Sequence, residues 1–482
     1  MSTVPQTTRV PRPRRPLHRA PSPTPTGHPR GVLVVLSVAA ASFSLLQSLY
    51  SPALPTLQRE LHAGPTAITW VLTAYLLSAA VFTPVLGRVG DAVGRRPVFV
   101  LVMLALGLGC VLAAIAPNVE FLLLARVVQG IGGAALPLAF GILRDALPPH
   151  RLPAAIGTIS ALVAAGSGLG VVVAGPVLTV FGTHVLLGLP AVPVLAAAFA
   201  ALRVVPRATR REPARVNPLA VTLLAVALVG LLVPVSQAGA WGWTSPVTLG
   251  LLAVSVLAAL GWVRVENRSA APLVDMATMR VPAVWTTHLA ALLFGAAMFG
   301  VFVYLPQLAQ VPTAAGYGFG LDATGAGLLM LPLPVAMFVA GVVGGRLDRG
   351  FPAPAQLLTG ALVCAAAAAG LAAAHGSAAL VAVEGGVFGL GVGLAYAAMT
   401  NIVVRAVPAA QTGAVSGVNA NTRVIGGALG AVLTTSIVTA HLQAGGVPRE
   451  SGFTTAFAVL AVLALGVAVV TGAGRRLARP VE

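Results

Sequence analysis

An arginine and a glutamine, Arg126 and Gln129, lie in the apolar run LLLARVVQGIGGAALP, where a spacing of three places both on one face of a helix. A buried arginine costs about 2.5 to 3.5 kcal/mol on membrane-insertion scales, so we expect Arg126 to face a polar cavity rather than lipid. There it could share a ligand or a water molecule with Gln129. The alternative is an arginine that only braces its helix or reaches to the membrane surface.

A second apolar run, VAVEGGVFGLG, carries Glu384, the one acid that lies well inside a predicted span. Burial and a nearby arginine shift the pKa of a carboxyl group in opposite directions. A carboxyl group that meets Arg126 in only one conformation could therefore bind and release a proton near neutral pH. The alternative is a hydrogen bond that anchors Glu384 to a neighbouring helix.

Other polar side chains in apolar runs are candidates to line a path for protons or substrate, although packing explains each of them better when it is taken alone. They are Gln47, Tyr50, Tyr304, Gln307, Tyr396 and Asn401. The histidines and acids show no spacing that suggests a metal site or a catalytic base. We therefore predict no metal, no cofactor and no enzymatic activity.

The stretch GRVGDAVGRRP concentrates charge and glycine between two apolar runs. Its glycines permit positive φ and close helix contacts, and its aspartate can accept hydrogen bonds from an arginine or from a helix N-terminus. The stretch predicts a tight, salt-bridged hairpin at a membrane face that acts as a gate; the alternative is an ordinary basic cytoplasmic loop. A shortened echo, GRLDR, follows later in the chain. The residues concerned are Gly87, Arg88, Gly90, Asp91, Gly94, Arg95 and Arg96, with Arg346, Asp348 and Arg349 in the echo.

Composition excludes a soluble globular protein, because 57% of the residues are hydrophobic, 9% are charged and the mean hydropathy is +0.93. Apolar runs of about 20 residues predict fourteen membrane spans. The predicted spans begin near Gly31, Thr66, Val98, Val119, Ala154, Val185, Pro218, Pro246, Ala283, Ala323, Ala353, Ser377, Thr412 and Gly452.

The arginines fix the predicted orientation, because cytoplasmic loops collect basic residues. With the N-terminus inside, Arg59 and Arg449 fall outside, Arg126 and Arg423 fall within helices, and all the others are cytoplasmic. This predicts a multi-pass protein of the cytoplasmic membrane with both termini inside. The net charge of +17 thus reflects topology, and we expect no nucleic-acid partner.

The fifth span reads GSGLGVVVAGP, where Gly170 and Gly175 allow close packing and Pro176 predicts a kink that serves as a hinge. This stretch resembles the antiporter motif of drug exporters, although Thr179 and Val180 stand where that motif has two glycines. The GRVGDAVGRRP stretch resembles the signature loop of the major facilitator superfamily. The Arg126 segment is similar to the fourth-helix motif of proton-coupled facilitators, in which the arginine is associated with proton movement.

The segments TWVLTAYLLSAAVFTPVLG and AWGWTSP resemble those of the fourteen-helix drug:proton antiporters of that superfamily. One feature of the family is missing, because Leu46 stands where the first helix normally has an aspartate, which excludes a proton carrier there. The resemblance implies an all-α polytopic membrane protein of the major facilitator fold, with two six-helix bundles and two inserted helices. The implied parts are a disordered basic cytoplasmic tail (1–30), an N-terminal bundle (31–202), a basic linker with inserted helices 7 and 8 (203–280), a C-terminal bundle (281–474) and a cytoplasmic tail (475–482).

The implied function is proton-coupled efflux of apolar or amphipathic small molecules, such as drugs and antibiotics, by alternating access. Few fixed charges are available to select a polar substrate, and the proton gradient would supply the energy. The expected partners are the hydrophobic substrate, protons and the lipid bilayer, with the chain acting as a monomer. The alternative is a facilitator or symporter for a metabolite.

Overall fold

Long apolar helices make up most of the computed structural model, which describes residues 29–206, 217–269, 272–348, 350–441 and 448–477. Fourteen helical segments among them are long and apolar enough to cross a membrane, which confirms the predicted span count and an all-α, multi-pass membrane protein. Most of the predicted N-terminal tail, part of the 203–280 linker, Arg349 and the last five residues lie outside the described residues.

The helices follow one another with short connections. They are α1 (Pro29–Glu60), α2 (Pro65–Val93), α3 (Arg95–Ala114), α4 (Val119–Gly130), η1 (Ile131–Ala134), α5 (Ala135–Ala146), α6 (Leu152–Gly188), α7 (Ala191–Val204), α8 (Pro218–Trp241), α9 (Pro246–Arg268), α10 (Met276–Met279), α11 (Pro282–Gln310), η2 (Thr313–Ala315), α12 (Ala323–Leu329), α13 (Pro332–Arg346), α14 (Ala353–Ala373), α15 (Ala378–Ala406), η3 (Ala409–Gln411), α16 (Thr412–Thr439) and α17 (Glu450–Leu477). The glycine-rich η1 joins α4 and α5 into one span.

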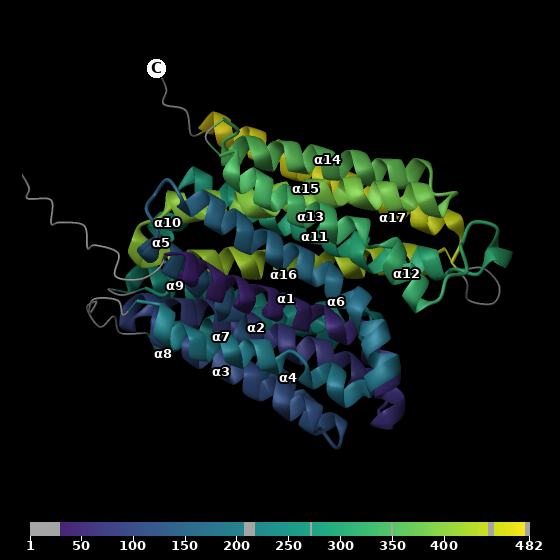
Figure 1. The fold of residues 1–482 in the computed structure, drawn as a ribbon, viewed down its shortest axis with the longest axis horizontal. Coiled ribbons are helices and arrows are strands. Elements are labelled where there is room, and N and C mark those ends of the chain that lie inside the picture. The colour runs from purple at the N-terminus through teal and green to yellow at the C-terminus, as the bar shows by residue number, and fades with distance from the viewer. Residues whose placement is uncertain (1–28, 207–216, 270–271, 349, 442–447, 478–482) are drawn as a thin grey trace, which may run out of the picture.

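The helices α1 to α7 form one half of the molecule and α11 to α17 form the other, with a central seam between the halves. In Figure 1, α3, α4 and α7 lie on one side, α14, α15 and α17 lie on the other, and α6 and α16 lie between them. Across the seam α2 packs on α16 and α6 packs on α13. Both contacts depend on glycine pairs. A Cβ on Gly87 would lie 2.8 Å from the carbonyl oxygen of Gly413, and a Cβ on Gly345 would lie 2.9 Å from the Cα of Gly157. Small residues of this kind let helix backbones approach closely.

The helices α8 and α9 form a pair that packs on the same seam. Ser255 of α9 donates a hydrogen bond to the Ala227 carbonyl of α8, at 2.7 Å, and joins the two helices. Leu228 and Leu232 of α8 are buried with Ala80 of α2. The pair therefore covers the side of the molecule where α2 and α16 meet.

The GRVGDAVGRRP stretch forms a tight, salt-bridged turn between two helices. The helix α2 runs to Val93, the chain turns at Gly94, with φ 124°, and Arg95 at the start of α3 pairs with Asp91. Pro176 lies inside α6, and the non-helical dihedral angles of that segment occur six residues later, at Gly182, with φ 79°. Glycine adopts positive φ at little cost, whereas proline fixes φ near −65° and has no N–H to donate.

Candidate functional site

A buried arginine cluster forms where α1, α2 and α4 meet. Arg126 is 1% exposed and lies seven residues into α4, about 10 Å from the helix end by helical rise. Its Nε donates to the Val71 carbonyl at 2.8 Å, and its Nη1 donates to Oε1 of Gln129 at 2.8 Å. The spacing of three therefore brings Arg126 and Gln129 into direct contact, as their positions in the sequence predict.

Two tyrosine rings enclose the guanidinium group. The Cζ atom of Arg126 lies 3.9 Å from the ring centroid of Tyr50 and 4.3 Å from that of Tyr75. The Tyr50 hydroxyl bonds to the Gln129 amide at 3.2 Å, and Nε2 of Gln47 donates to the Tyr75 hydroxyl at 2.7 Å. Cation–π contacts of a desolvated arginine contribute about 2 kcal/mol. The cluster therefore stabilises the positive charge of Arg126 through carbonyl oxygens and aromatic rings, and no carboxylate of the described residues forms an ion pair with it.

Asp91 connects the two halves at the end of α2. One carboxylate oxygen accepts from Nε and Nη2 of Arg95, at 2.9 and 2.6 Å. The other accepts from the backbone N–H groups of Gly413 and Ala414 at the N-terminus of α16, at 3.1 and 3.3 Å. A carboxylate at a helix N-terminus interacts favourably with the helix dipole. The aspartate therefore closes this end of the seam.

Arginines strengthen the same closure. Arg95 also donates to the Gly141 carbonyl and to Asp145, at 2.9 and 2.6 Å, and to the Ala409 carbonyl across the seam. Arg144 of α5 donates to the carbonyls of Val404 and Val407, at 2.7 and 2.8 Å, at the C-terminal end of α15. The described structure is thus closed at the end where α2, α5, α15 and α16 converge.

The remaining residues of the predicted gate have different surroundings. Gly90 packs against the Leu138 side chain, and Arg96 donates to the Leu202 carbonyl rather than to Asp91. Arg88 lines a cavity of about 210 Å³ together with Asp275.

The second-half echo is only partly equivalent. Asp348 accepts from Arg405 at 2.5 Å, whereas its counterpart Asp91 meets a helix N-terminus. Arg346 is exposed.

The sequence-predicted polar residues of the C-terminal half do not form one cluster. The hydroxyl of Tyr304 donates to Thr435 at 2.8 Å, and Gln307 is exposed. Nδ2 of Asn401 donates to the carbonyl of Ala397 in its own helix at 3.2 Å. On α6, the predicted hinge glycine Gly170 faces α1, where a Cβ would overlap Oγ of Ser48, and Gly175 faces Thr324 at 3.7 Å.

Glu384 lies away from the Arg126 cluster. A Cβ on Gly370 of α14 would lie 2.5 Å from Oε1 of Glu384, so the side chain faces α14. Gly391, seven residues later on the same helical face, contacts Cys364 of α14. The helices α4 and α15 belong to opposite halves (Figure 1). The structure therefore does not bring the carboxyl group to Arg126, because the helical phase of α15 directs it toward α14.

Two functional candidates escaped prediction from the sequence. Arg423 of α16 is buried and its Nη2 donates to the hydroxyl of Tyr396 at 2.8 Å. Arg144 joins the halves although it reads as an ordinary cytoplasmic loop residue. The signal for Arg423 was present, since an arginine inside an apolar span costs free energy unless it has a partner or a polar cavity.

The fold, the glycine contacts at the seam and the Asp91 closure define a transporter of two helical halves. Residues 36–431 match the family model described as Major Facilitator Superfamily, and the chain belongs to this superfamily. It is therefore a transporter and not an enzyme, and its substrates are small molecules.

Several curated proteins are similar to this chain. The puromycin resistance protein pur8 of Streptomyces alboniger is 30% identical over 84% of this chain and 81% of its own length. The tetracenomycin C resistance and export protein of Streptomyces glaucescens is 29% identical over 84% of this chain and 75% of its own length. The multidrug efflux pump LfrA of Mycolicibacterium smegmatis is 27% identical over 89% of this chain and 87% of its own length.

Solved structures support the fold. The human organic anion transporter MFSD10 superposes with a TM-score of 0.66 at 14% identity, covering 92% of this chain and 99% of that one. The proton:xylose symporter XylE superposes with a TM-score of 0.64 at 13% identity, covering 92% of this chain and 94% of that one. At these identities the similarity concerns the fold alone.

Proposed function

We propose that this protein exports apolar or amphipathic small molecules, including drugs or antibiotics, across the cytoplasmic membrane by alternating access. The similar curated proteins carry names of resistance and export proteins and multidrug pumps. The observation that carries the proposal is the closure of one end of the seam by Asp91, which contacts α16 through the Gly413 N–H. Breaking that contact would let the halves part at this end.

We further propose that the proton gradient drives export and that both termini are cytoplasmic, with the chain acting as a monomer. One proton charge moved through 100 mV releases about 2.3 kcal/mol, enough to sustain roughly a fifty-fold substrate gradient. Glu384 is the proposed carrier because, among the described acids, it lies farthest from a helix end, six residues into α15. Its neutral form would fit the contact with α14.

A facilitator or symporter for a metabolite is the competing function, because the fold serves both. A susceptibility panel compares cells that express the chain with cells that carry an empty vector. Export predicts raised minimal inhibitory concentrations for several amphipathic compounds, and lower accumulation of those compounds in the expressing cells. Unchanged susceptibility across the panel, with a growth advantage on one nutrient, favours the metabolite transporter.

A further inference from the structure

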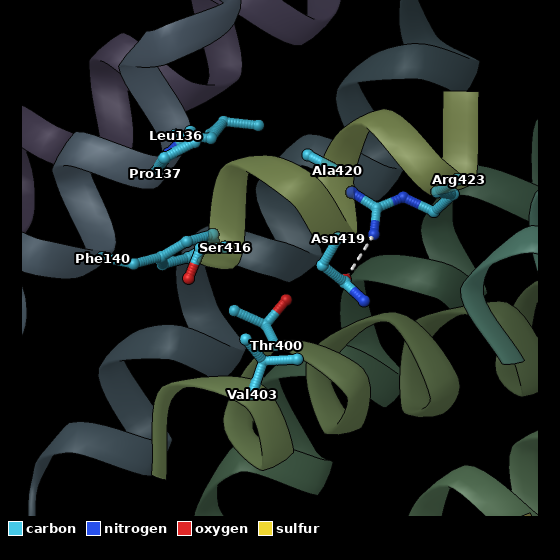
Figure 2. A pocket seen from close by; sticks show the side chains of 9 residues that line it. All are labelled: Leu136, Pro137, Phe140, Thr400, Val403, Ser416, Asn419, Ala420 and Arg423. Atoms are coloured by element: carbon cyan, nitrogen blue, oxygen red, sulfur yellow. Dashed lines mark hydrogen bonds between the residues drawn. The ribbon is translucent and has the colours of Figure 1, made fainter. Parts of the chain in front are cut away.

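A second buried arginine, Arg423 of α16, borders a small cavity at the seam between the two halves (Figure 2). Its Cζ lies 4.0 Å from the ring centroid of Tyr396, whose hydroxyl accepts from Nη2. Nη1 lies 3.4 Å from Oδ1 of Asn419. Among the described residues no carboxylate forms an ion pair with Arg423. A guanidinium group carries five N–H donors, so most of its hydrogen-bonding capacity is unused.

The cavity has one apolar wall and one wall that carries all of its polar side chains. Leu136, Pro137 and Phe140 of α5 supply the apolar wall from the N-terminal half. The facing wall, from α15 and α16 of the C-terminal half, carries the polar side chains Thr400, Ser416, Asn419 and Arg423. The space between them is about 10 Å³, which is room for about one water molecule.

A second, independent observation marks this wall as a binding surface. Ser416 is 6% exposed, and its Oγ has no hydrogen-bond partner among the described residues although it lines the cavity. Leaving a buried hydroxyl without a hydrogen bond costs stability, and a bound ligand that supplies the bond would remove that cost. His288 Nδ1 lies 3.3 Å from Asn419 Nδ2, and its Nε2 is buried without a hydrogen-bond partner among the described residues. The guanidinium group of Arg423 and the Ser416 hydroxyl thus border the cavity, and no carboxylate in the described part of the chain accepts from them.

We propose that Arg423, with Ser416 and Asn419, binds the acidic group of an amphipathic cargo molecule, while the apolar body of the cargo lies against α5. The proposal rests on the proposed export function and specifies its substrate class as organic anions with an apolar body. A carboxylate or sulfonate would accept the unused guanidinium N–H groups and offset the charge that the membrane disfavours.

The position of the cavity explains how such a cargo enters. Ser416 lies three residues after Gly413, so the wall belongs to the same part of α16 that Asp91 holds closed. When that end of the seam opens, α16 and α5 separate and the cavity widens toward the cytoplasm. In the closed state the cavity is too small for a cargo molecule, so the acidic group binds when this end opens and leaves the site as the seam closes again.

The test uses the purified full-length protein in lipid nanodiscs. The two probes, 1-pyrenebutyrate and 1-pyrenebutanol, share the pyrene ring and the alkyl linker and differ in the terminal group, which is an acid in one and an alcohol in the other. Fluorescence anisotropy, corrected with empty nanodiscs, gives each dissociation constant. The wild type should bind the acid more tightly than the alcohol. Arg423→Gln should weaken binding of the acid roughly ten- to hundredfold, the loss expected for a hydrogen bond to a charged group, and change binding of the alcohol less than about twofold.

Two variants separate recognition from folding and from bulk charge. Arg423→Lys keeps the charge and should retain part of the preference for the acid, whereas Arg264→Gln removes an exposed arginine of α9 and should leave both affinities unchanged. Equal affinity of the wild type for the two probes would overturn the proposal. An equal loss of affinity for the acid and the alcohol in Arg423→Gln would overturn it too. Selective binding of the acid without transport of either probe in vesicles would support the site and refute the export function.

Discussion

The carboxylate of Asp91 accepts the backbone N–H of Gly413 at 3.1 Å, across 322 positions of sequence and across the seam between the two halves. The same carboxylate holds Arg95 in a buried ion pair at 2.6 Å. One side chain therefore joins the end of α2 to the start of α16. A contact that exists in only one of two access states shifts the equilibrium between them.

Asp91→Asn should impair transport strongly while leaving membrane insertion and the intrinsic substrate affinity of the open state largely intact. The amide keeps an acceptor for one N–H group but loses the charge that Arg95 and the α16 N-terminus require. A hydrogen bond to a charged group contributes about 1.5 to 3 kcal/mol, so the equilibrium should shift about ten- to hundredfold toward the open state. Transport at the wild-type rate and equal expression would show that Asp91 has no role in gating.

Gly87→Ala should prevent the same end of the seam from closing. The added Cβ would lie 2.8 Å from the Gly413 carbonyl oxygen, closer than such atoms approach in proteins. Gly250→Ala on α9 is the matched control, because no atom lies within 4 Å of its added Cβ.

The measurement for Gly87→Ala is maleimide labelling of a reporter, Ser416→Cys. The native Cys110 and Cys364 are buried and should label little. Labelling should rise severalfold in the Gly87→Ala background and stay at its basal level with Gly250→Ala. Equal labelling in the two backgrounds would contradict a closure that depends on the glycine contact.

Arg126→Lys should reduce transport at least tenfold without loss of insertion. The guanidinium group reaches two oxygens, those of Val71 and Gln129, and lies between two tyrosine rings. An ammonium group is a point charge that does not reproduce this planar arrangement. Initial rates of export at matched expression decide the matter, and a wild-type rate for the lysine variant would mean that a positive charge alone suffices.

Glu384→Gln should abolish uphill, proton-driven export while downhill exchange of substrate continues. Glutamine has nearly the same shape as glutamate but binds no proton near neutral pH. Substrate-induced proton movement in inverted vesicles is the measurement, with the downhill exchange rate as the control for folding. A proton flux of normal size in the glutamine variant would remove Glu384 from the mechanism.

The architecture was accessible from the sequence because long apolar runs and the placement of arginines report directly on membrane spans. The contact between Arg126 and Gln129 was accessible too, since it depends only on helical spacing. The direction of the Glu384 side chain could not be predicted. A run as apolar as VAVEGGVFGLG gives no sign of which neighbouring helix each face of the helix contacts. Partners far apart in the chain, such as Asp91 with Gly413 and Arg144 with Val404, depend on how the halves dock, which local patterns do not encode.

The most direct test of proton-coupled export loads inverted membrane vesicles with an inside-acid gradient and adds the compound against which the susceptibility panel shows the strongest protection. Vesicles that contain the chain should take up the compound and lose part of the pH gradient as it is added, and control vesicles without the chain should do neither. Uptake that is independent of the pH gradient, with no proton movement when the compound is added, would contradict the account.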